Sequence, residues 1–276
     1  MSEPERADTG SVDPVGRRGV DSARALAVAL EAAQIAIEVL HSTARGTIAT
    51  KRDAADVVTD IDTATERAVR EHVASAFPGH AFVGEEFGGR DDGGPTWFCD
   101  PVDGTMNLAS GLPWTSFSLS LAVGRRPLVG VVADPWRRDV WHAVAGRGAF
   151  RGDEPLAVSD RSALAGAVVM TEWANHRPWP GMASLLGGLA EAMCTARVMG
   201  SGTLAVACVG VGRAAGAVIG RFAPEDHLAA ALICREAGAV VTDRHGTETT
   251  WPHGPLVVAA PGVHEQLQGL VEHSQR

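Results

Sequence analysis

The sequence predicts a layered α/β fold in which helices sandwich mixed and antiparallel sheets. Three features indicate it: a long amphipathic helix pattern near the start, a series of short β-like runs, and a second half where strand and helix patterns alternate. The chain has 276 residues, and at that length about three quarters of the unfolded surface can be buried. An enzyme-sized body is therefore expected.

The first half is expected to begin with helices and to continue with short strands. Residues 21–41 are rich in helix formers, with apolar residues at intervals of three and four. A second helix is expected over 63–77, where Pro78 and Gly79 end it. Alternation over 116–123 predicts an antiparallel sheet with one face buried. The expected strands are 80–86, 96–100, 116–124, 127–135 and 139–146.

Strands and helices alternate in the second half, which is typical of helices that cover a mixed sheet. The expected strands lie near 167–171, 197–199, 217–219, 239–243 and 255–260, and the expected helices near 182–193, 203–212, 226–237 and from 263. The pattern changes between residues 150 and 160. We therefore expect a flexible tail of residues 1–20, an N-terminal α+β subdomain of 21–155 and a C-terminal α/β subdomain of 156–276.

Composition and charge exclude some classes of partner. The formal net charge is −9, which disfavours nucleic acid or an anionic membrane held by bulk electrostatics. No stretch approaches the roughly 18 apolar residues of a membrane helix, and the N-terminus lacks the apolar core of a signal peptide. The four cysteines are far apart in apolar surroundings, as expected for reduced core cysteines of a cytoplasmic protein.

Acidic residues recur where strands end or helices begin. One such pair is more often a helix cap or a solvated turn, but four clusters at element ends are harder to explain locally. Oxygen ligands without His or Cys suit hard cations, above all Mg2+ beside a phosphate. The acids are Asp56, Asp62, Glu85, Glu86, Asp100, Asp103 and Asp226.

The stretch 97–107, WFCDPVDGTMN, carries the strongest signal. Two aspartates this close repel each other unless a cation or a proton lies between them. Pro101 stiffens the backbone between them, and Gly104 lets the chain turn so that N–H groups can face an anion. Thr105 adds a hydroxyl beside that anion. Mg2+ ions held by such acids could bind a phosphate ester and activate a water molecule, so the pattern indicates phosphoryl transfer.

Five stretches, taken in order, resemble the inositol monophosphatase family of Mg2+-dependent, lithium-sensitive phosphatases. They are DVVTDID, VGEE, WFCDPVDGTMNLASGLP, RVMGSGTLAVACVGVGRAAG and PEDHLAAALICREAGAVVTDRHG, and they run from about residue 51 to residue 246. The resemblance implies the five-layer α-β-α-β-α fold of the sugar-phosphatase type, two or three Mg2+ ions, a small phosphorylated metabolite as substrate, and a homodimer.

The resemblance also implies roles for the acids. The first metal ion is expected on Glu85, Asp100 and the carbonyl of Val102, and Asp100 is expected to bridge to a second ion on Asp103 and Asp226. Asp62 and Thr105 are expected to orient the attacking water, directly or through a third ion. The candidate catalytic residues are Asp62, Glu85 and Thr105.

Substrate contacts are implied at three places. The backbone of Gly104 and Thr105 is expected to meet the phosphate. The turn of Gly200, Ser201 and Gly202 is expected to contact the alcohol part of the substrate, next to Asp226. Lys51 matches a basic residue near the active-site loop, although a surface lysine is an equally good interpretation, and Glu86 is a further possible member.

The chain departs from the family pattern near the expected alcohol site. Inositol-specific enzymes carry a Glu seven residues before the last metal-binding Asp, where this chain has Ile219. An isoleucine cannot accept a hydrogen bond from a ring hydroxyl, so inositol is a doubtful leaving group. Glu225 stands where relatives have Trp, Arg221 is a candidate contact for a second polar group, and residues 172–180 could line the substrate mouth. His227 is expected to be a core or surface histidine.

Two other functions compete with this interpretation. A haloacid-dehalogenase-type phosphatase uses Asp-x-Asp-Gly-Thr, whereas this box has two residues between the acids, which spoils the pairing on one strand face. A non-catalytic interaction module would have no physical reason to keep so many mutually repelling acids. Among phosphatases the substrate stays open: an inositol phosphate, histidinol phosphate, a sugar phosphate or bisphosphate, or a 3′-phosphonucleotide.

Overall fold

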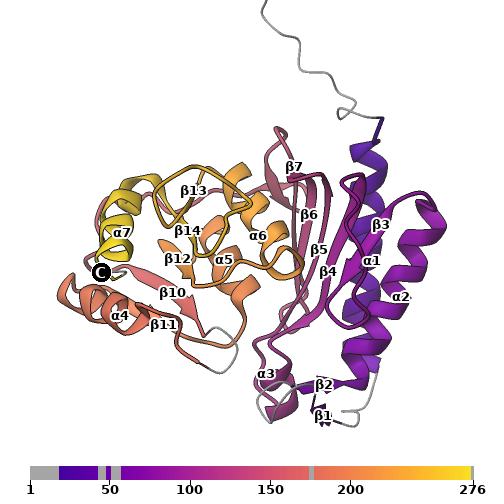
Figure 1. The fold of residues 1–276 in the computed structure, drawn as a ribbon, viewed down its shortest axis with the longest axis horizontal. Helices are drawn as coiled ribbons and strands as arrows, with labels where there is room; N and C mark the ends of the chain where they lie inside the picture. Colours follow the sequence, from indigo (N-terminus) through magenta and orange to yellow (C-terminus); the bar gives the residue numbers. More distant parts are fainter. Residues whose placement is uncertain (1–18, 43–47, 51–56, 174–176, 275–276) are drawn as a thin grey trace, which may run out of the picture.

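The computed structural model describes residues 19–42, 48–50, 57–173 and 177–274, and it stacks them in five layers. Helices α1 (Ser22–Ser42) and α2 (Asp60–Ala76) form one outer layer. A seven-stranded sheet, a middle pair of helices, a five-stranded sheet and a second outer pair of helices follow, as Figure 1 shows from one side to the other. The expected α-β-α-β-α arrangement is therefore confirmed.

The first sheet has the strand order β3-β4-β5-β6-β7-β8-β9. Only the β3–β4 pair is parallel, and the later pairs are antiparallel hairpins. Its strands are β3 (Ala81–Gly84), β4 (Pro95–Asp103), β5 (Ser116–Val123), β6 (Arg126–Asp134), β7 (Asp139–Val144), β8 (Ala149–Arg151) and β9 (Glu154–Pro155).

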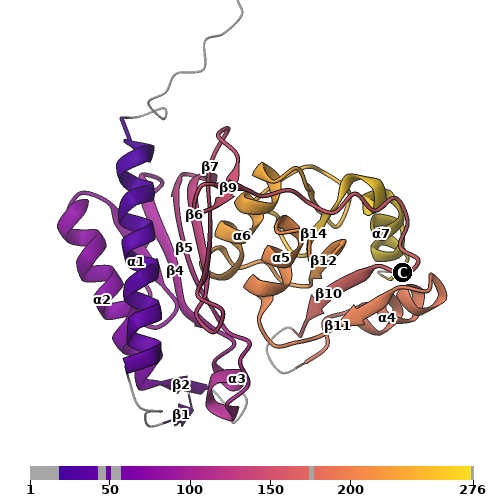
Figure 2. The same cartoon turned by 180° about the vertical axis from the view of Figure 1, so that it is seen from behind.

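The second sheet is mixed, with the order β11-β10-β12-β14-β13. Its strands are β10 (Val168–Glu172), β11 (Thr195–Arg197), β12 (Gly216–Ile219), β13 (Val240–Asp243) and β14 (Leu256–Ala259). Helices α4 (Met182–Glu191) and α7 (Pro261–Ser274) cover its outer face through an apolar cluster. The described C-terminal end lies beside these two helices, on the far side of the molecule from α1 and α2 in both views (Figures 1 and 2).

Helices α5 (Gly202–Gly210) and α6 (Pro224–Glu236) lie between the sheets, and one apolar cluster joins them to both. On β5, Phe117, Leu119 and Leu121 pack toward α1, so the serines that alternate with them face α6. These small side chains, with Gly130 on β6, let α6 approach closely, because a Cβ at Gly130 would lie 2.9 Å from the backbone of Ala229. The sheet is thus buried on both faces, and the expectation of one buried face was wrong.

Most expected elements are present within a few residues of their predicted bounds. The differences are short elements: β1 (Ile48–Thr50) pairs with β2 (Val57–Thr59), α3 (Thr105–Ser110) follows the acidic box, and β8 and β9 extend the first sheet. The proposed subdomain boundary near residue 155 falls between the two sheets, but the shared core means that the division stays a prediction. No helix in the described residues is long and apolar enough to cross a membrane.

Candidate active site

A cavity of about 730 Å³ opens where the two sheets approach each other. The end of β4 and the start of α3 form one wall, and the turn before α5 and the ends of β10 and β12 form the other. The first turn of α6 closes the cavity between them. Acids far apart in sequence meet here: Glu85, Asp100, Asp103, Glu225 and Asp226 all line it.

The acids of the cavity act on one another electrostatically. Burial and then the charges of Glu85, Asp226 and Asp103 raise the pKa of Asp100 well above its usual range. The pKa of Asp226 is raised in the same way, by burial and by its acidic neighbours. Glu225 also has a raised pKa, mainly from burial, and it faces the same group. Carboxylates gathered in this way need protons or cations between them.

The donor set fits hard divalent cations by its chemistry. The expected ligands are carboxylate oxygens and the carbonyl of Val102, and Mg2+ prefers such oxygen donors. Within the part of the chain that the structure describes, no three His, Cys, Asp or Glu side chains are grouped as a formed metal site. The acids thus line one space without forming a closed cage.

Asp62 lies behind the cavity and acts through Thr105. It is fully buried at the start of α2, where one carboxylate oxygen accepts hydrogen bonds from the N–H and the hydroxyl of Thr59. Its other oxygen accepts the hydroxyl of Thr105 at 2.9 Å. Burial raises the pKa of Asp62, and these hydrogen bonds oppose the rise. Thr105 lines the cavity, so its hydroxyl, held by Asp62, can hydrogen-bond to a small molecule there and orient it.

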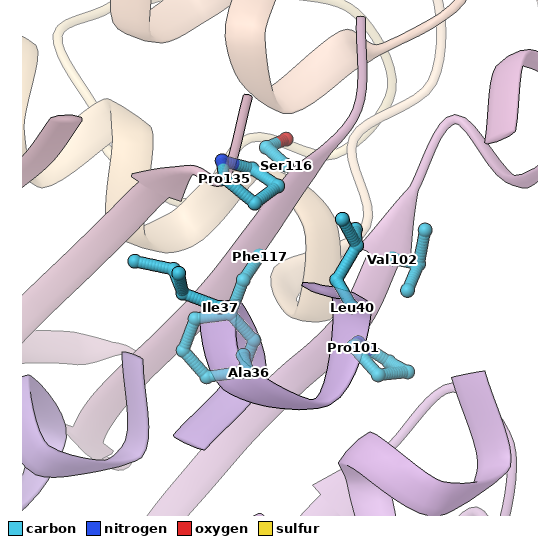
Figure 3. A pocket seen from close by; sticks show the side chains of 8 residues that line it. All are labelled: Ala36, Ile37, Leu40, Pro101, Val102, Ser116, Phe117 and Pro135. Atoms are coloured by element: carbon cyan, nitrogen blue, oxygen red, sulfur yellow. The ribbon is translucent and has the colours of Figure 1, made fainter. Parts of the chain in front are cut away.

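The acidic box is supported from behind by α1. A small cavity of about 10 Å³ lies between α1 and the strands, and Figure 3 shows Pro101 and Val102 facing Ile37 and Leu40 of α1 across it. At the front, Asp100 accepts a hydrogen bond from the N–H of Val102 at 2.9 Å. The register of β4 against β5 shifts between Asp100 and Asp103. This bulge lets both acids reach the cavity, which a regular strand with two residues between them would not allow.

Glu66 positions the turn that carries Glu85. It is fully buried on α2, one turn beyond Asp62, and it accepts the N–H groups of Glu86 at 2.6 Å and Phe87 at 3.2 Å. Arg70 pairs with it at 2.7 Å.

The same turn is fixed from two further sides. The N–H of Glu85 donates to the carbonyl of Cys99 on β4 at 3.1 Å, and Arg70 donates to the carbonyl of Gly88 at 2.8 Å. A Cβ at Gly84 would lie 2.0 Å from the Glu66 carboxylate, so any larger residue there would displace that carboxylate. Helix α2 therefore determines where both Asp62 and Glu85 stand.

The turn before α5 is fixed by residues from both halves. Glu172, at the end of β10, accepts the N–H groups of Met199 at 2.9 Å and Gly200 at 2.7 Å. From the other half, Asn107 donates to the carbonyls of Met199 and Trp114. Burial raises the pKa of Glu172 to about 7. This carboxylate is thus a buried support of the wall that was expected to meet the alcohol.

Ser201 faces Asp103 rather than the cavity. Its hydroxyl caps α5 by accepting the N–H of Leu204, and it donates to Asp103 at 2.7 Å. Asp103 also accepts the N–H of Thr203 at 2.6 Å. Burial raises the pKa of Asp103. Gly200 and Gly202, on either side of Ser201, line the cavity.

The residues of the expected alcohol site also meet at the cavity. Ile219 and Arg221 line it, and Ile219 is the register partner of Glu172 on the neighbouring strand. His227 is buried with Nδ1 beside the carbonyl of Ala223 at 3.1 Å, and burial lowers its pKa to about 4. The expectation of a satisfied histidine is confirmed.

Most sequence-predicted site residues line one cavity. They are Glu85, Asp100, Val102, Asp103, Gly104, Thr105, Gly200, Gly202, Ile219, Arg221 and Asp226. Asp62, Glu86 and Ser201 stand behind the wall. Lys51 and Asp56 lie outside the described residues, as do residues 174–176 of the expected mouth segment. Their expected roles stay predictions.

Four residues have supporting roles that the sequence did not predict, although the last two lie in stretches that it singled out: Glu66, Arg70, Asn107 and Glu172. A signal existed for two of them. Glu66 and Arg70 are four residues apart on a predicted helix, and Glu66 is four residues after Asp62, which places all three on one face. Asn107 and Glu172 have only tertiary partners, and no local pattern marks them.

Comparisons with known proteins agree with this geometry. The model of the inositol monophosphatase family matches residues 21–276. Nus factor SuhB from Pasteurella multocida is 35% identical over 221 residues, which cover 79% of this chain and 83% of that protein. Inositol monophosphatase 2 from Solanum lycopersicum is 34% identical over 232 residues, covering 80% of this chain and 88% of that protein.

The fold is similar to that of solved structures over almost their whole length. Extragenic suppressor protein suhB from Bartonella henselae superimposes with a TM-score of 0.82 at 25% identity, covering 90% of this chain and 98% of that one. An inositol monophosphatase from Anabaena (Nostoc) gives a TM-score of 0.80 at 28% identity, covering 92% and 97%. The relatives carry different names, so the comparisons leave the substrate open.

Proposed function

Because the chain belongs to the inositol monophosphatase family, whose members are phosphatases, we propose that it hydrolyses a small phosphate monoester with Mg2+ and a water nucleophile. The observation that supports this most is the convergence of Glu85, Asp100, Asp103 and Asp226 on one cavity beside the Gly104–Thr105 turn. Burial first, and then the charges of the neighbouring acids, raise the pKa of Asp100 and of Asp226, and protons or cations would relieve both effects. A phosphate ester bound with such cations would lie within reach of Thr105.

Each residue has a distinct task in the proposed reaction. Two or three Mg2+ ions would neutralise the phosphate and make a bound water more acidic. Glu85, Asp100, Asp103, Asp226 and the carbonyl of Val102 would hold those ions. Asp62, through its hydrogen bond to Thr105, would orient the attacking water in line with the leaving oxygen. The backbone at Gly104, whose φ of 93° turns the chain here, would meet the phosphate.

Inositol is not the favoured alcohol. Ile219 lines the cavity where inositol-specific enzymes carry a carboxylate, and its side chain accepts no hydrogen bond. Histidinol phosphate, a sugar phosphate or bisphosphate, and a 3′-phosphonucleotide remain alternatives. A non-catalytic module is less favoured, because it would keep four repelling acids without use. The homodimer and the absence of a nucleic-acid partner also stay predictions.

Phosphate release over a panel of these monoesters tests the proposal. We expect turnover with Mg2+, no turnover with EDTA, and inhibition by lithium. Trapping of a phospho-aspartyl enzyme would support the haloacid-dehalogenase-type rival instead. Absence of phosphate release from every ester at saturating Mg2+ would contradict the proposed function.

A further inference from the structure

Large apolar side chains gather at the active-site cavity, where Trp173, Val198 and Met199 form an apolar wall on the side of the second sheet and Leu112 comes from the loop after α3. Among the described residues, seven large apolar side chains are more than a third exposed, and four of the seven line this cavity. The four are Leu112, Trp173, Val198 and Met199, and Trp173 and Leu112 are 51% and 54% exposed. Apolar surface concentrated in this way marks a place where something apolar binds.

This apolar wall is continuous with the reacting centre. Val198 and Met199 directly precede Gly200, and Trp173 directly follows Glu172, whose carboxylate holds that turn. Ile219 extends the wall from the neighbouring strand. An ester whose phosphate meets the acids would therefore place its alcohol part against Trp173 and its neighbours.

Of the polar side chains beside the apolar wall, Glu172 and Asn107 are already engaged within the protein, and Arg221 is the cationic group that also lines the cavity. Glu172 accepts two backbone N–H groups, and Asn107 donates to the carbonyls of Trp114 and Met199. The ring of His227 has Nδ1 beside the carbonyl of Ala223 at 3.1 Å. A leaving group rich in hydroxyls would lose its water here and regain few hydrogen bonds, which is costly.

A half-exposed tryptophan suits a flat ring better than an aliphatic chain. Aromatic rings stack with favourable geometry beyond the area that they bury. The planar guanidinium of Arg221 lies on the same cavity and can also stack on a flat ring.

This inference rests on the proposed phosphatase function. We infer that the alcohol part of the natural substrate carries an aromatic or heteroaromatic ring that packs on Trp173 and the apolar wall. The reaction itself is unchanged. The water oxygen bonds to phosphorus, the bond from phosphorus to the ester oxygen breaks, and the ring-bearing alcohol leaves with a proton. The apolar wall then selects the ester and the acids cleave it.

Three synthetic esters test the inference: 2-phenylethyl phosphate, 2-cyclohexylethyl phosphate and glycerol 2-phosphate. The first two release alcohols of similar acidity, so they differ mainly in ring chemistry. We expect kcat/KM with Mg2+ to be highest for the phenyl ester. Trp173→Ala should lower kcat/KM for the phenyl ester roughly tenfold, which is the size of loss seen when an aromatic side chain that stacks on a base is replaced by alanine. The same variant should leave kcat/KM for glycerol 2-phosphate unchanged. Trp173→Phe should retain most of the preference.

Met193→Ala is the matched control, because Met193 is 74% exposed but does not line the cavity. It should change none of the three values. Equal kcat/KM for the phenyl and cyclohexyl esters, or an equal loss on all three in Trp173→Ala, would overturn the aromatic assignment. A changed sedimentation coefficient of Trp173→Ala with unchanged ester preference would assign the wall to contact between copies of the chain. No hydrolysis of any ester by the wild type would overturn the proposed function, and this inference with it.

Discussion

The two walls of the cavity are built in different ways. On the wall from the first sheet, acidic side chains stand on a bulged strand, packed from behind by α1 and fixed from the side by α2. On the wall from the second sheet, the backbone is equally well held, but Trp173, Val198 and Met199 add apolar and partly exposed side chains to the cavity. On the proposed function, the first wall would supply most of the chemistry and these apolar side chains would select the ester.

This difference predicts two kinds of mutational effect. Changes on the acidic wall should act on every substrate, because they alter cation binding or the position of the water. Changes on the apolar wall should act on some substrates only. The following substitutions test that separation.

Asp100→Asn should have the largest effect, a loss of turnover of at least about a thousand-fold on all esters. The charge of Asp100 is central to the repelling group, so its removal should also raise the melting temperature in EDTA. Phosphate release and thermal unfolding measure the two outcomes. Asp153→Asn, in the exposed turn between β8 and β9, is the control and should change neither. A fully active Asp100→Asn protein would refute the metal role of this wall.

Glu66→Gln should weaken Mg2+ binding roughly 10- to 100-fold, as loss of a ligand-supporting group does in other metal sites. The substitution removes the ion pair with Arg70 and one strong acceptor for the turn of Glu85. Calorimetric titration with Mg2+ in the absence of substrate measures it directly. Glu71→Gln, exposed on the same helix, is the matched control. If only the melting temperature falls and the affinity is kept, Glu66 serves packing alone.

Glu172→Gln should have the smallest effect on turnover, but it should change how stability depends on pH. The pKa of Glu172 is raised from 4.5 to about 7, so the folded chain binds a proton that the unfolded chain releases across this interval. The free energy of unfolding should therefore fall as pH rises through the interval, with a contribution on the order of 2 to 3 kcal/mol.

Denaturant unfolding in EDTA at pH 5 and pH 8 tests this linkage. Asp100 and Asp226 contribute a slope of the same sign, so the comparison is between the variant and the wild type. The difference between the two pH values should be smaller in Glu172→Gln. An identical difference in both proteins would show that Glu172 does not titrate in this range.

The strand and helix patterns predicted a layered α/β fold, and the resemblance to the inositol monophosphatase family implied its five layers and most of the residues that line the cavity. The acidic clusters themselves could be found from the residues alone, because acids at strand ends and a glycine-containing box are local patterns with direct physical meaning. The two buried faces of β5 could not be predicted, because its serines look solvent-facing until α6 is placed against them. Periodicity shows which side chains share a face, but not what covers that face.

The supporting residues show a further limit. Glu172 and Asn107 are separated by 65 positions and hold the same turn, so their role appears only in three dimensions. Ser201 was expected at the substrate and instead lies on Asp103. The motif identified the segment that forms this side of the cavity. The direction of the Ser201 side chain, however, depends on its position as the N-cap of α5.

The contact between Gly104 and Gly200 has a consequence for motion. A Cβ at Gly104 would lie 2.8 Å from the carbonyl oxygen of Gly200, so the halves meet there through bare backbone. Close backbone packing of this kind leaves little room for a hinge movement at this point, and the side chain of Asn107 ties the same turn to the first half. On the proposed function, we therefore expect the shape of the cavity to be largely preformed before the ester binds.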